Sequence, residues 1–414
     1  MPIDTNLRDA LLESNPWWAG RFFDIEVRDR AAFAVLGALE KKKQITAIYW
    51  LRRTGKSFAL YHVAKKRLER GTDPKATLYF SFDDFPQARL KDIIDSATVI
   101  NGGTRPSCLL LDEIQKMAGW QEQVKREYDL HGTKMFVTGS ETLFLKKGAK
   151  ESLAGRVYEM RFEALSFGEF LAFRGIDAKR MDSARTESEL ERYLYTGGFP
   201  ELAGEADLFF IRKYIKEGII DKAIFRELPA RAGIDDPSLL ERMMARIASN
   251  PGILIDKNSL AADMGCSRVT AARYLFYLES AFLITSLFNY SRNQATSGRK
   301  LKKYYPGFSC LAVYGGRSDP VFFSKFVETC CALKTGARFF WRNPQKDEVD
   351  MVLTDPLRPV EVKYQNDIHG GDFAGLEKFR GRFGAKKGLI ITKNDSAGRG
   401  WVSAVPFREL MLQG

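Results

Sequence analysis

The segment LRRTGKS, residues 51–57, limits the possible fold more than any other part of the chain. An apolar and β-branched run, QITAIYW, precedes it, and a helical pattern, FALYHVAKKRLERG, follows it. This order of strand, glycine-containing loop and helix is the one that a phosphate-binding loop of the G-x-x-x-x-G-K-[ST] type requires. We therefore predict a parallel α/β sheet in which a helix begins at this loop.

A loop of this kind binds the phosphates of a nucleotide through backbone N–H groups and the N-terminus of the following helix. Lys56 would add a positive charge with a catalytic role, and the hydroxyl of Ser57 would ligate Mg²⁺. We therefore expect ATP and Mg²⁺ as cofactors. The predicted nucleotide-binding residues are Arg53, Thr54, Gly55, Lys56, Ser57 and Phe58.

Trp50 stands where the loop pattern has its first glycine. That glycine serves the turn that leaves the strand, whereas Gly55 lies where a phosphate comes closest to the backbone, so the change at residue 50 is the less damaging of the two. A negative φ at residue 50 would accommodate the indole. A positive φ would cost about 1–3 kcal/mol and distort the loop. The sequence is compatible with either conformation.

A second motif, PSCLLLDEIQ, is an apolar run that ends in two adjacent acids. We predict that Asp112 belongs to the Mg²⁺ shell and that Glu113 polarises the attacking water. The next apolar run, TKMFVTGSE, ends in Thr138 and Ser140, and we expect both beside the γ-phosphate, with Ser140 as a catalytic residue. With residues 76–84 and 156–162, five predicted strands alternate with helical segments, which predicts a doubly wound sheet.

The middle of the chain carries a helix-turn-helix pattern in residues 258–284. Its apolar residues have the spacing of two crossed helices that bury one seam. They are Leu260, Ala261, Met264, Val269, Ala272, Leu275 and Leu278. Residues 280–318 then contain six Lys or Arg and no acid, as expected for a wing that contacts DNA phosphates. The predicted nucleic-acid-binding residues are Arg268, Thr270, Arg273, Arg299, Lys300, Lys302 and Lys303. The alternative is a winged helix that contacts only proteins.

The C-terminal third combines an amphipathic helix carrying Glu328 with two strand-like runs. Asp350 lies on the first run, and the alternation of strand residues places Glu361 and Lys363 on one face of the second. Carboxylates from adjacent strands that converge bind Mg²⁺ or Mn²⁺, and a nearby lysine stabilises a pentacovalent phosphate. We therefore predict a metal at Asp350 and Glu361, and catalytic roles for Glu328, Asp350, Glu361 and Lys363. A degenerate domain that binds without cleaving is the alternative.

Net charge and the absence of membrane signals limit the classes of partner. The 64 Lys and Arg against 52 Asp and Glu give +12 and a pI of about 9.3, which favours polyanions, although a basic, well-solvated surface is the alternative. No apolar run reaches membrane-spanning length, and five scattered cysteines suit a reducing compartment. We expect a cytoplasmic protein without a membrane partner.

The motifs NPWW, AIYWLRRTGKS, LLLDEIQ, VTGS, SLAGRVYEMRFEALSFGEFL and TGGFPE follow one another as in a family of prokaryotic AAA-type P-loop ATPases, which this chain resembles over nearly its whole length. The chain departs from that family at Trp50. The resemblance implies an assembly of several copies. It also places Arg156 where the family carries an arginine that contacts phosphate in its own or a neighbouring subunit, with a surface salt bridge as the alternative. The C-terminal residues resemble the restriction-endonuclease-like (PD-(D/E)xK) superfamily, a domain in which such ATPases often end.

The predicted architecture is α/β. It comprises a P-loop parallel-sheet ATPase domain (1–180), a helical lid (181–236), a winged helix-turn-helix domain (237–306) and a nuclease-like α/β domain (307–414). The predicted function is ATP hydrolysis coupled to the handling of duplex or branched DNA, with metal-dependent cleavage. The alternatives are a nucleotide-gated DNA-binding regulator with slow hydrolysis and an inactive nuclease-like domain, and an ATPase whose partner is a protein.

Overall fold

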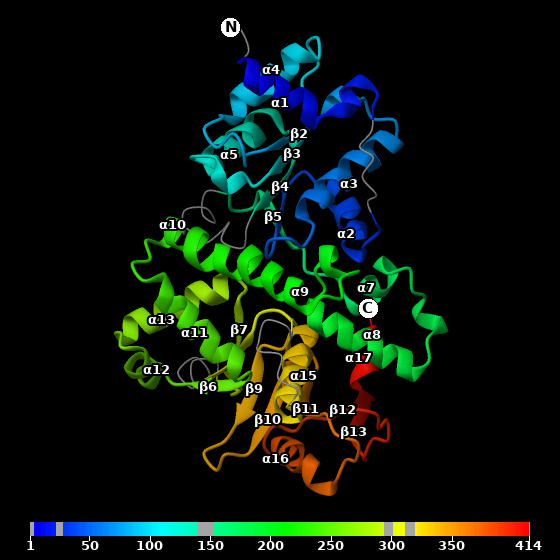
Figure 1. Cartoon of the computed structure of the whole chain (residues 1–414), viewed down its shortest axis with the longest axis vertical. Coiled ribbons are helices and arrows are strands. Elements are labelled where there is room, and N and C mark those ends of the chain that lie inside the picture. Colours follow the sequence, from blue (N-terminus) through cyan, green and yellow to red (C-terminus); the bar gives the residue numbers. More distant parts are fainter. Residues whose placement is uncertain (1–3, 22–27, 140–152, 294–300, 311–318, 414) are drawn as a thin grey trace. The chain divides into compact units, whose positions relative to one another are not determined.

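The computed structural model describes residues 4–21, 28–139, 153–293, 301–310 and 319–413 (Figure 1). The chain divides into two compact units, Met1–Ala164 and Leu165–Gly414, which are described separately below. The second unit contains the segments predicted as a helical lid, a winged helix and a nuclease-like domain. No helix in the described part of the chain is both long enough and apolar enough to span a membrane.

The first unit is built on a parallel sheet. Its strands are β1 Ile45–Tyr49, β2 Thr77–Ser81, β3 Cys108–Asp112, β4 Lys134–Gly139 and β5 Val157–Arg161, in the order β2-β3-β4-β1-β5. Every neighbouring pair is parallel. This confirms the parallel α/β sheet predicted for the N-terminal part.

Helices cover both faces of this sheet. They are α1 Thr5–Ser14, α2 Ala31–Glu40, α3 Lys56–Glu69, α4 Leu90–Ile100 and α5 Trp120–His131. Ile45 and Ala47 of β1 pack in the same apolar cluster as α4 and α5, whereas Ile48 packs in a second cluster with α2 and α3. The strand is therefore apolar on both faces, because each face of a parallel sheet is covered by helices.

The NPWW motif covers the exposed edge of the sheet at β2. Asn15 follows α1, its side-chain amide donates 2.9 Å to the carbonyl of Tyr79, and its side-chain oxygen accepts 2.7 Å from the N–H of Tyr79. The indole N–H groups of Trp17 and Trp18 each donate 3.0 Å to the carbonyl of Thr77. Side chains thus satisfy backbone groups that an edge strand would otherwise leave unpaired.

We predict that Asn15→Ala lowers the free energy of unfolding by about 2–3 kcal/mol, because it leaves a buried N–H and a buried carbonyl of Tyr79 without partners. Urea unfolding of the full chain, followed by tryptophan fluorescence, measures this change. Asn6→Ala, at an exposed position of α1, is the matched control and should shift the midpoint little. Equal midpoints for the two variants would contradict the prediction.

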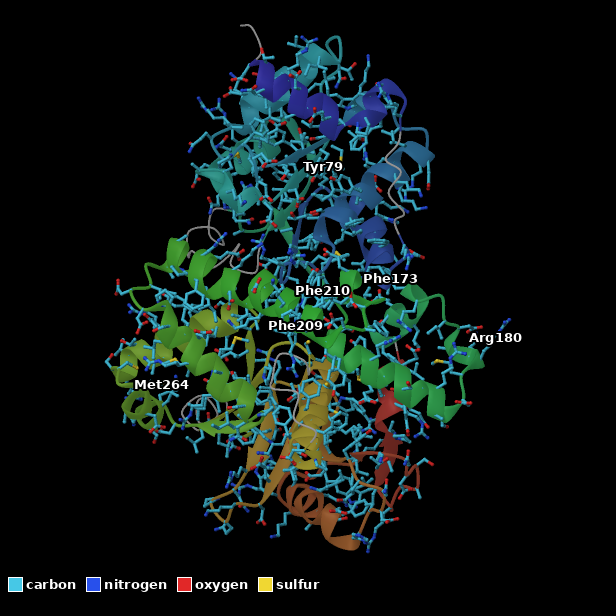
Figure 2. The ribbon with its side chains drawn as sticks, in the orientation of Figure 1. Tyr79, Phe173, Arg180, Phe209, Phe210 and Met264 are labelled. Atoms are coloured by element: carbon cyan, nitrogen blue, oxygen red, sulfur yellow. The ribbon has the colours of Figure 1, made fainter. Side chains whose placement is uncertain are left out.

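The second unit contains more helices than the first. They are α7 Phe167–Phe173, α8 Ser183–Thr196, α9 Leu208–Ile215, the π-helical turns Lys216–Ile220 and Ala223–Glu227, α10 Leu228–Ala232, α11 Pro237–Ser249, α12 Lys257–Met264, α13 Arg268–Ser280, α15 Pro320–Thr335, α16 Ala374–Phe383 and α17 Phe407–Leu412. On α9, Phe209 and Phe210 are 74% and 47% exposed (Figure 2).

One mixed sheet runs through the second unit. Its strands are β6 Ile253–Ile255, β7 Ile284–Asn289, β8 Lys302–Pro306, β9 Phe339–Arg342, β10 Glu348–Thr354, β11 Leu357–Lys363, β12 Gly388–Thr392 and β13 Val402–Pro406, in the order β13-β12-β11-β10-β9-β7-β8-β6. The predicted wing, β6 to β8, joins the C-terminal strands because β7 pairs with β9. The sheet therefore continues across the predicted domain boundary at residues 306 and 307.

The helix-turn-helix pattern forms α12 and α13, which meet at Gly265 with φ of 68°. Gly265 is in the left-handed region, which glycine adopts without a steric penalty. The seam differs from the prediction at three residues, because Val269 is 74% exposed and Met264 and Ala272 are only half-buried. Ala271 is buried in place of Ala272. Tyr274 of α13 is instead buried, together with Leu275 and Leu278.

Candidate functional site

The loop before α3 encloses the ammonium group of Lys56. Lys56 Nζ donates 3.1 Å to the carbonyl of Trp50 and 2.9 Å to that of Leu51, and the hydroxyl of Thr54 donates 3.1 Å to the same Leu51 carbonyl. Gly55 has φ of 95°, a conformation in which another residue would be strained. The loop is therefore wrapped round its lysine at the N-terminus of a helix, where free backbone N–H groups favour an anion.

The two predicted Mg²⁺ ligands lie in contact. Ser57 Oγ, in the first turn of α3, donates 2.6 Å to Oδ2 of Asp112 at the end of β3. The hydroxyl of Tyr79 donates 3.0 Å to the same oxygen, and Thr138 on β4 donates to Oδ1. Figure 2 shows Tyr79 in the first unit. Three hydroxyls thus hold a carboxylate that lies 5% exposed, so its orientation is fixed before any ligand binds.

Glu113 has an uncommon backbone conformation. Its φ is 50°, which is uncommon for a residue other than glycine. Its N–H donates 3.1 Å to the hydroxyl of Thr138, and its carboxylate accepts a hydrogen bond from Gln115. Burial raises the pKa of Glu113, and Lys56 lowers it in part. A partly buried carboxylate with a raised pKa is suited to accept a proton from water.

The hydroxyl of Thr138 contacts both acids, since it donates to Asp112 and accepts from the N–H of Glu113. We expected this residue beside the γ-phosphate. Ser140, predicted as a catalytic residue, lies outside the described residues. Of the other predicted nucleotide-binding residues, Arg53 is exposed and has φ of 63°. Phe58 is 47% exposed on the first turn of α3. Both remain predictions.

Trp50 packs into the first unit with little exposed surface. It is 6% exposed, and the guanidinium of Arg161 on β5 lies 4.1 Å from the centroid of its ring. Trp50 is not among the described residues other than glycine that have a positive φ. The structure thus agrees with the unstrained alternative, in which a bulky residue replaces the first glycine and packs behind the loop.

Two arginines of the first unit differ in environment. Arg30 is buried and donates 3.0 Å to the carbonyl of Thr54 and 2.9 Å to that of Glu163. It therefore connects the loop to the segment that follows β5. Arg156 forms a bidentate ion pair with Asp129, with N···O distances of 2.8 and 3.2 Å. For Arg156 the described contacts agree with the surface salt bridge that the sequence left as an alternative.

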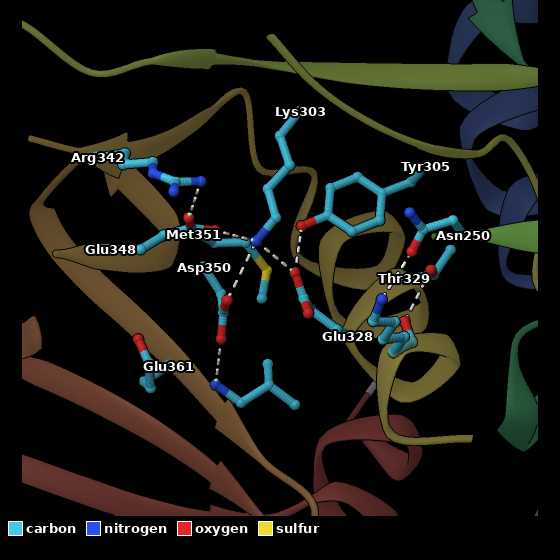
Figure 3. Close-up of polar contacts among 12 residues, drawn as sticks. Asn250, Lys303, Tyr305, Glu328, Thr329, Arg342, Glu348, Asp350, Met351 and Glu361 are labelled. Atoms are coloured by element: carbon cyan, nitrogen blue, oxygen red, sulfur yellow. Dashed lines mark hydrogen bonds and ion pairs between the residues drawn. The ribbon is translucent and has the colours of Figure 1, made fainter. Parts of the chain in front are cut away.

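The acidic residues of the C-terminal third surround a lysine (Figure 3). The ammonium of Lys303 on β8 lies 2.7 Å from Glu328 Oε1, 2.8 Å from Glu348 Oε1 and 3.2 Å from Asp350 Oδ1. Only 4% of Lys303 is exposed. Burial lowers the pKa of Lys303. The three carboxylates and the Tyr305 hydroxyl raise it by more than burial lowers it, so the pKa lies well above its usual value. The prediction that Lys303 contacts nucleic acid is wrong, because its charge is buried and fully committed to carboxylates.

Glu361 and Lys363 lie on one face of β11, as predicted, and form an ion pair of 2.8 Å. On the neighbouring strand β10, Asp350 Oδ2 accepts a hydrogen bond of 2.9 Å from the N–H of Val362 of β11. Burial and then the charge of Asp350 raise the pKa of Glu361 to about 8. Among the described residues, no group of three or more His, Cys, Asp and Glu is arranged to hold a metal ion. The predicted metal site at Asp350 and Glu361 is therefore unsupported.

Sequence reasoning missed Lys303 and Glu348 as members of this cluster. Glu348 lies two residues before Asp350 on β10, and strand alternation places both on one face. That signal was available. No comparable signal linked Lys303 to residues 25 to 47 positions further along the chain.

The remaining nucleic-acid-binding predictions lie in different settings. Arg268 and Arg273 are exposed on α13. Thr270 shares a hydrogen bond of 2.9 Å with Ser267, which caps that helix. Lys302 is half-buried, with its ammonium 4.2 Å from the ring centroid of Phe288. Arg299 and Lys300 lie outside the described residues.

Comparison with known families assigns part of the chain. Residues 42–171, which contain the loop, the acidic pair and all five strands of the N-terminal sheet, match the AAA domain family. This segment is therefore similar to AAA-type P-loop ATPase domains. Residues 187–307 and 329–410 match two domains of unknown function, DUF8612 and DUF4143. The winged-helix and nuclease-like assignments thus stay predictions.

Two curated relatives share moderate identity with the chain. An uncharacterized protein of Haemophilus influenzae is 30% identical over 248 residues, or 58% of this chain and 61% of that protein. One from Methanocaldococcus jannaschii is 28% identical over 267 residues, or 61% of this chain and 58% of that protein. The matched region thus spans about three fifths of the length of each relative.

Two solved structures are also similar to this chain. The Walker-type ATPase of Pyrococcus abyssi has a TM-score of 0.42 and 15% identity, over 69% of this chain and 95% of that one. The replication initiator DnaA, bound to AMPPCP and single-stranded DNA, has a TM-score of 0.32 and 17% identity, over 64% and 92%. At these TM-scores the likeness carries no conclusion about substrate or partner.

Proposed function

We propose that this protein binds ATP with Mg²⁺ at the loop before α3 and hydrolyses it. The hydrogen bond of 2.6 Å between Ser57 Oγ and Asp112 Oδ2 carries the proposal. It joins the two predicted Mg²⁺ ligands, which lie 55 residues apart in the sequence, at the N-terminus of a helix. An AAA domain match over the same residues supports it. A hydroxyl beside a carboxylate at such a position is the donor set that a magnesium-bound phosphate needs.

Each residue of the site has a separate role in this proposal. Mg²⁺–ATP, when bound, supplies the electrophilic phosphorus and a cation that neutralises phosphate oxygens. Ser57 and Asp112 hold the cation, and the ammonium of Lys56 neutralises phosphate charge. The carboxylate of Glu113 takes the proton of the attacking water. Arg30 keeps the loop in place through the carbonyl of Thr54.

Calorimetric titration of the full chain with ATP, in the presence of Mg²⁺, tests this proposal directly. We expect binding with Mg²⁺ and slow release of phosphate, and we expect EDTA to weaken the binding. The same titration with GTP shows whether the base matters. Absence of heat and of phosphate release at saturating ATP would rule out the proposed function.

Duplex DNA is the partner that we propose for the second unit. The supporting observation is the pair of exposed arginines, Arg268 and Arg273, on the second helix of a helix-turn-helix. A net charge of +12 favours the same class of partner. However, Val269 and Phe276 of α13 are 74% and 53% exposed. These apolar side chains would also suit a protein partner, so the test below distinguishes the two.

We predict that Arg268→Ala combined with Arg273→Ala weakens binding to duplex DNA by roughly 10- to 100-fold, because two phosphate contacts are lost. The plot of log affinity against log salt should also become shallower by about 2 units. Fluorescence anisotropy with a labelled duplex measures both quantities. Arg242→Ala, an exposed arginine on α11, is the control. Salt-independent binding, or no binding, would favour a protein partner.

DNA cleavage is not part of this proposal. The ammonium of Lys303 pairs with Asp350, one of the two predicted metal ligands, and with Glu328 and Glu348 beside it. The second unit in this proposal binds DNA, and ATP hydrolysis in the first unit gates that binding. This corresponds to the regulator that the sequence left as the alternative function.

A further inference from the structure

We propose that the ammonium of Lys303 is the resident cation of the C-terminal acidic cluster, where it takes the place of a divalent metal ion. The cluster consists of Glu328, Glu348 and Asp350. It ties the predicted wing to the C-terminal strands without metal, and its latent affinity for a divalent cation is exposed only when the lysine is removed. This inference does not depend on ATP binding or hydrolysis.

The geometry round the ammonium is that of a bound cation. One oxygen from each of three carboxylates converges on Lys303 Nζ, at 2.7, 2.8 and 3.2 Å. The carboxylates come from different elements, with Glu328 on α15 and the other two on β10 (Figure 3). A lysine ammonium has three protons to donate, which matches three acceptors.

The cluster is closed as well as charged. Glu328 also accepts 2.5 Å from the hydroxyl of Tyr305, and Glu348 Oε2 lies 3.3 Å from Arg342. Gly252 forms part of the wall, because a Cβ there would lie 3.3 Å from Cε of Lys303 and 3.4 Å from Oε1 of Glu328. The lysine therefore fills the space between the carboxylates, and a hydrated Mg²⁺ would have to displace it.

The distances explain why the cluster takes an ammonium and not a metal as it stands. Divalent cations bind oxygen at about 2.0–2.6 Å, so the three oxygens would have to move inward by up to about 1 Å. With the lysine present they are held apart, in agreement with the absence of a metal-holding group among the described residues. Without it, three buried like charges would repel one another unless another cation entered.

Lys303 and its carboxylate partners lie on different parts of the second unit. The lysine lies on β8, which pairs with β6 and β7 of the predicted wing. Its partners lie on α15 and β10 of the C-terminal part. One buried charge thus connects two parts that share a sheet. A permanent ammonium, unlike a metal, cannot be removed by a chelator or by a change in metal supply.

The test compares Mn²⁺ uptake by the full chain without nucleotide, measured by the loss of the free Mn²⁺ signal in electron paramagnetic resonance. We expect wild type, Asp350→Asn and Lys302→Met to take up equal amounts, because none of them has an open site in the cluster. Lys302, the neighbour on β8, is the matched control for Lys303. Lys303→Met should bind roughly one additional Mn²⁺ per chain, and Lys303→Met combined with Asp350→Asn should lose it.

Thermal unfolding supplies a second readout. EDTA should leave the Tm of wild type unchanged, whereas Lys303→Met in EDTA should melt roughly 5–10 °C lower and recover in part with Mn²⁺. Additional Mn²⁺ uptake by wild type that Asp350→Asn abolishes would overturn the proposal, and this comparison holds even if Lys303→Met fails to fold. A folded Lys303→Met that binds no additional Mn²⁺ would overturn it as well.

Discussion

Lys56→Ala should reduce ATP hydrolysis by about 100-fold or more. The ammonium of Lys56 is held in the loop by the carbonyls of Trp50 and Leu51, so it is already at the N-terminus of α3. Alanine removes the positive charge that stabilises the developing negative charge on the phosphate oxygens. Phosphate release under saturating ATP and Mg²⁺ measures the loss, and calorimetry should show weakened binding too.

The control for this variant is Lys66→Ala, on the same helix. Lys66 pairs with Glu69 at 2.8 Å on the surface of α3. An exposed pair of this kind contributes little to stability, so hydrolysis should stay within about 2-fold of wild type. If Lys56→Ala and Lys66→Ala hydrolyse ATP equally well, the loop is not the catalytic site. Circular dichroism of both variants shows whether the fold is retained.

Glu113→Gln should separate ATP binding from ATP hydrolysis. We expect hydrolysis to fall by about 100- to 1000-fold, because an amide cannot take the proton of the attacking water. Calorimetric ATP binding should change little, since glutamine has nearly the same shape as glutamate. A single-turnover assay with bound ATP measures the chemical step directly.

The pH dependence of wild type provides a further check on Glu113. Burial raises the pKa of its carboxylate. A base must be deprotonated to act, so hydrolysis should fall as pH falls through this raised pKa, earlier than it would for an ordinary glutamate. Glu122→Gln, on the exposed face of α5, is the matched control and should leave the rate and its pH dependence unchanged. Normal turnover by Glu113→Gln would assign the base to another residue.

The N-terminal sheet and its nucleotide site follow closely from the sequence. Four of its five strands are short apolar runs, and helical patterns alternate with the strands, so local periodicity was sufficient. Ser57 and Asp112 meet because parallel strands end at one edge of the sheet. Whether Trp50 is accommodated in the loop or distorts it depends on its φ, and a sequence does not reveal a single backbone angle.

The acidic cluster of the second unit could be predicted only in part. Asp350 and Glu361 lie on neighbouring strands as expected, because β10 and β11 are close in the sequence and pair as an antiparallel hairpin. Lys303 was assigned to a basic surface because it lies in a run rich in lysine. Lys302 and Lys303 are adjacent on β8, so their side chains lie on opposite faces of the strand. Only the face of Lys303 contacts the carboxylates.

The sequence by itself determined the parts that depend on neighbouring residues: the parallel sheet, the loop with its lysine and hydroxyl, the acidic pair and the helix-turn-helix. Tertiary structure alone decided that Asn15 covers the edge at β2, that β7 pairs with β9, and that Lys303 lies among three carboxylates. These contacts join residues far apart in the chain. Their free energy depends on burial and on charges brought together by folding, and no local pattern records either.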